Sequence, residues 1–387
     1  MPPKITRVRW VASNLPWGIS FNEQTGIFTG TPDKDDVGEY DIPVTVETNF
    51  GRHQEYVKLK VREKVEWDKI ETRATLRDNS AITYHPKYGV VAYCRDGSYY
   101  YLYGCSKGDL TTWNTYVRVK DMSSGDYVGI LYGIVTDANS NYVYCVGSAA
   151  SGKIIRASQL VTSGNNFLVG VAPPVLYQPW CAACYASSLN TIFYVSRNGY
   201  VVKFKNNTIQ SGYKSINHGS ETNDNCVAYS TSAKKLCVSI KNSTVATSTD
   251  GDTWEIGDAP DNLLDLEYRT DLSKFFARGE NTKLFYVSDD GLSWVQYNNT
   301  PIPLVTVKSL AYSQSYGYCA VGQGDDGTEQ HSVHSVDGES WKSKKITDDD
   351  VSFVNVIFAP GSFNAFIAKP VSSTKYLYLI KGIDIDD

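Results

Sequence analysis

Short apolar runs separated by polar turns recur along most of the chain, and no stretch rich in Ala, Glu, Lys and Leu favours a helix. Seven units begin with an apolar run, and a polar turn and a second apolar run follow each of them. Such runs, bounded by Gly, Asn, Asp and Ser, predict β-strands joined by tight turns. The opening runs are residues 81–84, 131–135, 181–186, 226–229, 264–268, 310–312 and 354–358. The second runs are residues 89–94, 142–146, 191–195, 235–240, 274–277, 316–321 and 364–368.

The spacing of these units indicates a repeat architecture. The opening runs lie about 40 to 50 residues apart, which is the length of a four-stranded propeller blade. We therefore expect an all-β protein in which residues 63–387 form a seven-bladed β-propeller. Six blades with an additional odd domain is the alternative count.

Several units contain a polar turn that ends in Trp. Three close copies are residues 248–254, 288–294 and 335–341, and a looser copy is 106–113. They resemble the Asp-box of sialidase-like propellers, although the close copies are one residue shorter. In such a turn the Asp carboxylate can accept backbone N–H groups, Gly takes a left-handed conformation and Trp buries its ring between blades. We assign this structural role to Asp250, Gly251, Trp254, Asp290, Gly291, Trp294, Asp337, Gly338, Trp341 and Trp113.

The last unit indicates how the ring closes. It ends in a third strand, residues 376–380, without a fourth strand that carries Trp. The segment that begins with Glu66 and Trp67 resembles the segment that begins with Trp341. We expect the stretch around Trp67 to lie beside Leu377 as the missing outer strand. Both chain ends would then share one sheet and leave no free edge.

Residues 1–62 have a different pattern. The segment 15–32 reads as two strands with turns, and two longer alternating strands follow, joined by a turn at Asn49, Phe50 and Gly51. The segments LPWGISF, TGIFTGTP and GEYDIPV resemble the immunoglobulin-like repeat of microbial surface proteins and phage virion proteins. The resemblance implies a short sandwich domain with an exposed sheet edge. A spacer and a specific binding module are both open readings of its role.

Composition excludes several classes of function. The chain of 387 residues has 28 Tyr and two Met, a charged fraction of 20% and a formal net charge of −5. This charge and the absence of long basic runs disfavour nucleic-acid binding. No apolar run reaches the roughly 18–20 residues of a membrane helix. The first residues lack the apolar core of a secretory signal, so we expect synthesis in the cytosol.

The eight cysteines do not predict a metal or redox centre. Cys94, Cys145, Cys237 and Cys319 lie in apolar runs, where a buried thiol is expected. A disulfide between Cys94 and Cys105 is the open alternative. The remaining motif, Cys181-x-x-Cys184, lacks a second pair or nearby His residues that would complete a zinc site. We expect no cofactor and no metal.

The sequence predicts no catalytic site. Sialidases use an arginine triad and an F/Y-R-I-P segment, and the latter does not occur here. The box aspartates are poor catalytic candidates because they lie in turns, although a pair of carboxylates from different blades remains an open glycosidase reading. His331 and His334 near Asp325 and Asp326 are explained by an exposed polar loop. The acidic runs 348–350 and 384–387 are expected to be solvated, with calcium binding as the open alternative. Arg95, Arg156, Arg197, Arg269 and Arg278 are scattered through the propeller segment rather than grouped as a triad.

Loops at one mouth of the ring are the expected binding surface, because they carry Ser, Gly, Asn, Asp and Tyr. The longer loops are residues 120–129, 158–180, 210–224, 322–330 and 371–375. Part of the run Tyr99, Tyr100, Tyr101 and Tyr103 is able to stack on sugars, and strand alternation buries at least half of it.

Together these features resemble a bacteriophage virion protein of the tail, fibre, collar or head surface. The resemblance implies a non-enzymatic role in particle assembly or in attachment to a host glycan or protein receptor. Its partners would be other virion proteins, in several copies on a symmetric assembly, without nucleic-acid binding or membrane insertion. A bacterial surface carbohydrate-binding protein and a divergent glycosidase are the alternatives.

Overall fold

The chain consists of β-strands and the short 3₁₀ turn η2 (Ser187–Leu189), with no α-helix in the part that the structure describes. This computed structural model confirms the prediction of an all-β protein. The chain divides into two compact units, Met1–Glu66 and Trp67–Asp387. The structure describes residues 8–16, 18–30, 38–61, 67–76, 81–106, 110–121, 125–126, 130–136, 143–148, 154–158, 160–162, 167–171, 180–205, 208–210, 214–216, 225–240, 242–324, 327, 329–346, 352–371 and 374–381.

The first unit contains a three-stranded and a two-stranded antiparallel sheet. The larger sheet has the order β1-β4-β5, and the smaller sheet pairs β2 with β3. Phe21 and Phe28 face each other across the smaller sheet with ring centroids 4.7 Å apart. The strands are β1 (Val8–Ala12), β2 (Ile19–Asn22), β3 (Ile27–Gly30), β4 (Gly38–Thr48) and β5 (Gly51–Val61).

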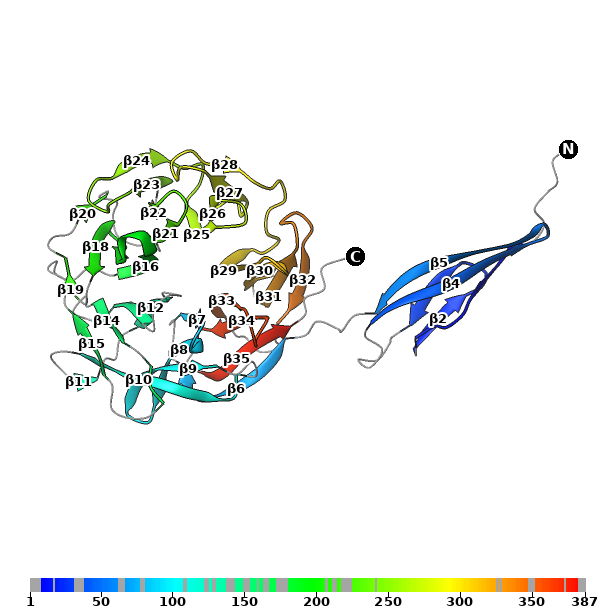
Figure 1. The fold of residues 1–387 in the computed structure, drawn as a ribbon, viewed down its shortest axis with the longest axis horizontal. Helices are drawn as coiled ribbons and strands as arrows, with labels where there is room; N and C mark the ends of the chain where they lie inside the picture. The colour runs from blue at the N-terminus through cyan, green and yellow to red at the C-terminus, as the bar shows by residue number, and fades with distance from the viewer. Residues whose placement is uncertain are drawn as a thin grey trace. The chain divides into compact units, whose positions relative to one another are not determined.

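The sheets of the second unit follow one another around a ring in chain order (Figure 1). One sheet has five strands: β16 (Trp180–Ala186), β17 (Thr191–Ser196), β18 (Tyr200–Lys205), β19 (Thr208–Ile209) and β20 (Lys214–Ser215). Three sheets have four strands each. They comprise β21 (Cys226–Ser230), β22 (Lys235–Ile240), β23 (Thr244–Ser248) and β24 (Glu255–Asp258); β25 (Leu263–Arg269), β26 (Lys274–Gly279), β27 (Phe285–Ser288) and β28 (Val295–Gln296); and β29 (Thr306–Ser313), β30 (Gly317–Gln323), β31 (Gln330–Ser335) and β32 (Lys342–Lys345).

The other strands form one thirteen-stranded sheet, which joins three of the units expected from the sequence. They are β6 (Asp68–Leu76), β7 (Ile82–His85), β8 (Gly89–Asp96), β9 (Tyr99–Cys105), β10 (Trp113–Asp121), β11 (Gly125–Asp126), β12 (Ile130–Thr136), β13 (Val143–Ser148), β14 (Ile154–Ser158), β15 (Phe167–Val171), β33 (Phe353–Ala359), β34 (Ala365–Pro370) and β35 (Thr374–Lys381). Two contacts join the units: β15 pairs parallel with β10, and the end of β6 pairs with β8.

The opening strands of neighbouring units lie side by side. β7 lies next to both β12 and β33, and the contacts β12–β16, β16–β21, β21–β25 and β29–β33 extend this circle. The sheets that contain β25 and β29 pack through a shared cluster that includes Phe276 and Leu310. The opening strands therefore form the inner part of the ring, and each chain segment adds strands outward from them (Figure 1).

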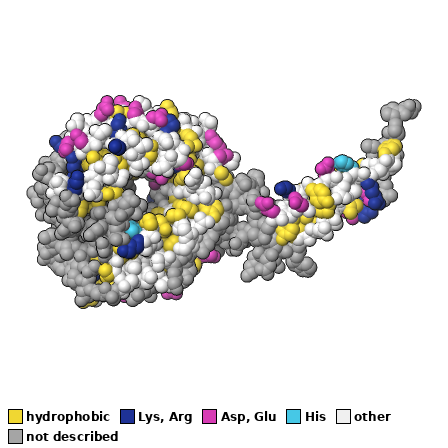
Figure 2. Space-filling model, in the orientation of Figure 1, with side chains coloured by type: hydrophobic (Ala, Val, Ile, Leu, Met, Phe, Trp, Pro, Cys, Tyr) yellow, Lys and Arg dark blue, Asp and Glu magenta, His cyan; other side chains and the backbone are white. Residues whose placement is uncertain are grey.

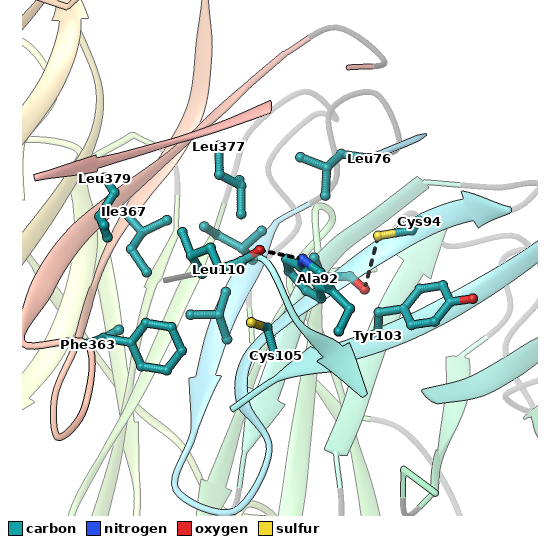
Figure 3. Close-up of a cluster of buried hydrophobic side chains, with 14 of the residues drawn as sticks. Leu76, Ala92, Cys94, Tyr103, Cys105, Leu110, Phe363, Ile367, Leu377 and Leu379 are labelled. Atoms are coloured by element: carbon teal, nitrogen blue, oxygen red, sulfur yellow. Dashed lines mark hydrogen bonds between the residues drawn. The ribbon is translucent and has the colours of Figure 1, made fainter. Parts of the chain in front are cut away.

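Strand β6 joins the start of the second unit to its end. It pairs antiparallel with β35, with Ile70 opposite Leu377 and Lys69 opposite Tyr378. This is the position that the sequence analysis gives to the stretch around Trp67. Figure 3 shows Leu76 and Leu377 directed toward one cluster of buried side chains to which the first and last repeat units of the second unit both contribute. The described residues of the two ends are thus held by both hydrogen bonds and apolar packing.

Replacement of Leu377 tests the energetic weight of this packing. Leu377 is fully buried, so Leu377→Ala should lower the free energy of unfolding by about 2–5 kcal/mol, the usual cost of a cavity. Its neighbour Tyr376 is 37% exposed, and Tyr376→Ala should cost about 0.5 kcal/mol or less. Urea denaturation of both variants gives the comparison, and equal losses would contradict the proposed core position.

Candidate functional site

Each box turn connects the third and fourth strands of its sheet. In the first, Asp250 Oδ1 accepts hydrogen bonds from the N–H groups of Asp252 and Thr253, at 2.7 and 2.9 Å. Ser248 Oγ donates to the same carboxylate at 3.0 Å and accepts the N–H of Gly251 at 2.7 Å. The turn therefore satisfies its own backbone N–H groups, as the residue types predict.

The same arrangement recurs twice. Ser288 Oγ donates to Asp290 at 2.9 Å, and Ser335 Oγ donates to Asp337 at 3.0 Å. Backbone bonds of 2.7 to 2.9 Å complete both turns, from Leu292 and Ser293 to Asp290 and from Glu339 and Ser340 to Asp337. The three turns are one structural motif.

These hydrogen bonds keep the box carboxylates ionised. The backbone N–H groups of Thr253 and then Asp252 lower the pKa of Asp250 to about 2. Burial alone would raise the pKa of Asp290, but backbone and hydroxyl donors outweigh it and hold the pKa at about 2. The pKa of Asp337 is also lowered, chiefly by its backbone donors. A general acid needs a pKa close to the working pH, so this environment does not suit acid catalysis at neutral pH.

The indole of each box folds back onto its own turn. Trp254 Nε1 donates to the carbonyl oxygen of Gly251 at 3.2 Å, and the equivalent bonds of Trp294 and Trp341 are both 3.0 Å. Trp113 makes the same bond to the carbonyl of Leu110 at 2.8 Å, and Leu110 has the left-handed φ of 59°. The looser copy therefore shares the Trp geometry, while its Asp109 lies outside the described residues.

The box turns also dock onto the preceding sheet. A β-carbon on Gly291 would lie 2.6 Å from Thr247 Cγ2, and one on Gly338 would lie 2.8 Å from the Phe285 ring. Gly251 approaches Phe193 in the same way. Glycine is therefore required twice, for its positive φ and for this close approach. The sequence pattern indicated only the first requirement.

Trp67, at the start of the second unit, also contacts a neighbouring sheet. It is 9% exposed, and its Nε1 donates to Ser332 Oγ at 2.8 Å, in the sheet that precedes the last one. The ring of His334 lies 6.3 Å from Trp67 and 6.4 Å from Phe366. The expectation that His331 and His334 occupy an exposed polar loop is wrong, because both lie in β31 and His334 is 5% exposed.

A second repeated contact was missed in the sequence. Tyr or Phe occupies the position before the last residue in six opening strands, namely Tyr84, Tyr185, Tyr229, Tyr268, Tyr312 and Phe358. Five of them reach the first turn of the preceding sheet. Their partners are Phe363 for Tyr84, Ser188 for Tyr229, Ser232 for Tyr268, Asp271 for Tyr312 and Tyr316 for Phe358. The aromatic residue that ends most opening runs is the signal that would have found them.

Two of the arginines are held in ion pairs within their own sheet. Arg278 is 2% exposed and contacts Asp265 at 2.7 Å. Arg269 contacts Asp271 at 2.5 Å and lies over the ring of Tyr312, 3.2 Å from its centroid. Charged groups that bind each other in this way stabilise the framework, and freeing them for a substrate carboxylate would leave a partner unpaired.

Glu267 is the acid of the described residues whose pKa is raised. Its side chain is exposed on the inner strand β25, but the surrounding protein replaces part of the water around the carboxylate and raises its pKa to about 7. The nearby charge of Arg269 partly opposes this effect. The neighbouring carboxylates Asp265 and Asp271 raise it further. A carboxyl group that titrates near neutral pH is a property of many catalytic acids, although buried charge networks also produce it.

The cysteines whose side chains the structure describes are free thiols, and the side chains of Cys145 and Cys181 lie outside the described residues. Cys94 and Cys105 are both buried and free, so the disulfide considered between them is not formed. Burial raises the pKa of Cys94 to about 12 and also raises that of Cys184, which keeps both thiols protonated. Within the described part of the chain, no group of three His, Cys, Asp or Glu is arranged to hold a metal ion. Asp325 and Asp326 and the acidic runs 348–350 and 384–387 lie outside the described residues.

The Tyr run of β9 divides between two environments. Tyr100 and Tyr103 are 7% and 4% exposed, whereas Tyr99 is 42% exposed and Tyr101 is partly buried. Figure 2 shows hydrophobic, charged and other side chains interspersed over the described surface in that view. Most of loops 120–129, 158–180 and 210–224 lies outside the described residues.

Comparison with known protein families finds a match within the first unit. Residues 4–62 match the family model described as "Putative Ig domain". No curated protein matches the chain. Among the described residues, no helix has the length and apolar character needed to cross a membrane. The immunoglobulin-like character of residues 4–62 is thus supported by a family match as well as by the sequence motifs.

A pair of glycine variants tests the docking of the box turns. Gly291 and Gly97 both have positive φ, but a β-carbon on Gly97 would meet no atom within 4 Å. Gly291→Ala should therefore lower the free energy of unfolding by about 1–3 kcal/mol more than Gly97→Ala, because only the first crowds a neighbouring sheet. Denaturant unfolding provides the measurement. Equal decreases in the free energy of unfolding would show that the close approach of Gly291 to the neighbouring sheet does not affect stability.

His334 should make the protein sensitive to acid. Burial lowers its pKa from 6.5 to about 3, and its Nδ1 has no hydrogen-bond partner among the described residues. The unfolded chain binds this proton near pH 6.5 and the folded chain does not, so stability should fall as pH decreases from about 6.5 towards 3.

The thermal midpoint at pH 7.5, 6 and 4.5 measures this effect. The decrease should be smaller in His334→Gln, whereas His53→Gln, at an exposed histidine of the first unit, should behave as the natural sequence. An unchanged pH dependence in His334→Gln would exclude His334 as its source.

Proposed function

We propose that the second unit is a seven-bladed β-propeller and that the chain is a non-enzymatic component of a bacteriophage virion. In this role it would mediate particle assembly or attachment to a glycan or protein of the host surface. The circle of opening strands, the pairing of β6 with β35 and the three box turns support the fold. Propellers of this kind present loops at one mouth as a binding surface.

The immunoglobulin-like first unit supports the virion assignment. Residues 4–62 match the "Putative Ig domain" family model, and their motifs resemble repeats of microbial surface and phage virion proteins. Two units without an obvious shared catalytic motif suit a protein that connects a particle to another surface. Other virion proteins would be its partners, and the chain would be synthesised in the host cytoplasm before assembly.

The non-enzymatic part of the proposal rests on charged side chains that already bind other groups of the protein. Asp250, Asp290 and Asp337 each bind the N–H groups of a turn, so they are ionised and their Oδ1 atoms are already occupied. Arg269 and Arg278 each bind an acid of their own sheet. A sialidase-like reaction would need such groups to face a substrate.

Glu267 favours glycoside hydrolysis as a second candidate function. Its pKa of about 7 suits a general acid. Hydrolysis also requires a second carboxylate beside the scissile bond. The neighbouring Asp265 and Asp271 are each bound to an arginine, at 2.7 and 2.5 Å. Adhesion is therefore the better supported function.

The location of the chain tests the virion proposal. Particles purified by density gradient should contain the chain in a fixed ratio to the major coat protein, measured by quantitative mass spectrometry. Antibodies against residues 67–387 should label the particles and reduce their attachment to cells. Recovery of the chain only outside particles would contradict the proposal. Release of sugar from host polysaccharide that Glu267→Gln abolishes would establish the glycosidase instead.

A further inference from the structure

Three partly exposed tyrosines form one face of the β9–β10 pair. Tyr101 lies opposite Arg118, and Tyr116 lies opposite the buried Tyr103, which places these side chains on the same side of the sheet. Tyr99 lies two residues from Tyr101 and therefore shares this side. We call Tyr99, Tyr101 and Tyr116 the tyrosine shelf.

The rings of the shelf are close enough to form one continuous surface. The ring centroids of Tyr101 and Tyr116 lie 6.0 Å apart in an edge-to-face arrangement. Tyr103 fills the space beside both, at 5.4 Å from Tyr101 and 6.0 Å from Tyr116. Tyr103 is buried, so it supports the two rings from the side.

Polar groups border the shelf at the tip of the β8–β9 hairpin. Arg118 lies over the ring of Tyr99, with its guanidinium carbon 3.4 Å from the ring centroid. Asp96 is exposed and accepts a hydrogen bond from the Tyr103 hydroxyl at 2.8 Å. Burial is the main cause that raises the pKa of Tyr101, so its hydroxyl stays protonated at neutral pH and able to donate.

Stability does not account for the exposed part of this cluster. The opposite face of the same strands carries Tyr100, Leu102 and Val117, which are buried in a hydrophobic cluster. The shelf side also contributes to packing, because Tyr103 is buried in the cluster that the two ends of the second unit share, and Tyr101 and Tyr116 pack against this cluster. Tyr99 remains 42% exposed although it belongs to a group of aromatic rings. Exposed aromatic groups gathered in one place, with polar groups beside them, mark binding surfaces.

We propose that the tyrosine shelf binds the pyranose rings of a surface saccharide chain. A pyranose has an apolar C–H face and a rim of hydroxyl groups. Its apolar face matches the Tyr101 ring and the face of the Tyr99 ring that Arg118 does not cover. The Asp96 carboxylate can accept hydrogen bonds from these hydroxyls, and the Tyr101 hydroxyl can donate to ring and hydroxyl oxygens. This site deepens the proposed attachment function and rests on it.

The shelf is already held in place before a ligand arrives. The hydrogen bond from Tyr103 to Asp96 and the packing of Arg118 on Tyr99 fix both sides of the hairpin tip. Tyrosine has few rotatable bonds, so little side-chain entropy remains to be lost on binding. Because the shelf is an open surface with few polar groups, binding of one saccharide should be weak and should gain from several copies on a particle.

Binding of two defined oligosaccharides to the full chain tests the proposal. The probes are immobilised cellohexaose, which is neutral, and a hexasaccharide of polygalacturonic acid, which is acidic. We expect the chain to bind at least one of them, and Tyr99→Ala and Tyr101→Ala each to weaken that binding about tenfold, which corresponds to about 1.4 kcal/mol.

Tyr376→Ala is the matched control. Tyr376 is also partly exposed, at 37%, and also lies beneath a cation, with Lys69 Nζ 4.6 Å from its ring centroid, but it does not belong to the shelf. Tyr376→Ala should bind the saccharide as tightly as the natural sequence does. Circular dichroism of all variants establishes that each is folded, and Tyr99→Phe should retain binding because stacking needs only the ring.

The possible failures are distinguishable. Equal binding by Tyr99→Ala, Tyr101→Ala and Tyr376→Ala would overturn the shelf as the site while leaving attachment through another surface intact. If the natural chain binds neither probe, saccharide recognition by the shelf is overturned, even if the chain is found in particles. Shelf-dependent binding by a chain that is absent from particles would support the site and contradict the virion role.

Discussion

A row of sheets has an unpaired edge at each end unless its ends meet, and this constraint governs the second unit. The chain meets it by placing β6, its first strand there, beside β35, its last. Leu76 and Leu377 then enter a single hydrophobic cluster (Figure 3). Trp67 completes the joint by bonding Ser332 of the preceding sheet. The other contacts between sheets repeat along the chain, but the pairing of β6 with β35 joins the first and last strands of the second unit.

Two sets of repeated contacts hold successive sheets together, one at the outer strands and one at the inner strands. At the outer strands, the Trp and Gly of each box turn pack on the sheet before it, as Trp341 does on Phe285 at 5.8 Å. At the inner strands, an aromatic residue reaches the first turn of the preceding sheet, as Tyr312 does at Asp271. The box aspartates bind the N–H groups of their own turns, which explains their low pKa values.

Sequence reasoning located the strands and the box turns because both depend on local residue patterns. It placed Trp67 beside the last sheet because that segment resembles the one after Trp341. It failed where burial depends on distant partners. His334 looked like part of an exposed loop, yet it packs against Trp67, whose bond to Ser332 spans 265 residues. Alternation predicted that part of the Tyr run is buried, but the hairpin register was needed to show that Tyr99 and Tyr101 share a face with Tyr116.

Native-state hydrogen exchange of the β6 and β35 amides tests the closure most directly. If β6 closes the ring, the amides of Ile70 and Leu377 that take part in the strand pairing should exchange only with global unfolding, at the same free energy as those of the central strand β34. Free exchange throughout β6 while β34 remains protected would show that the two ends are not joined, and the account of the ring would then be wrong.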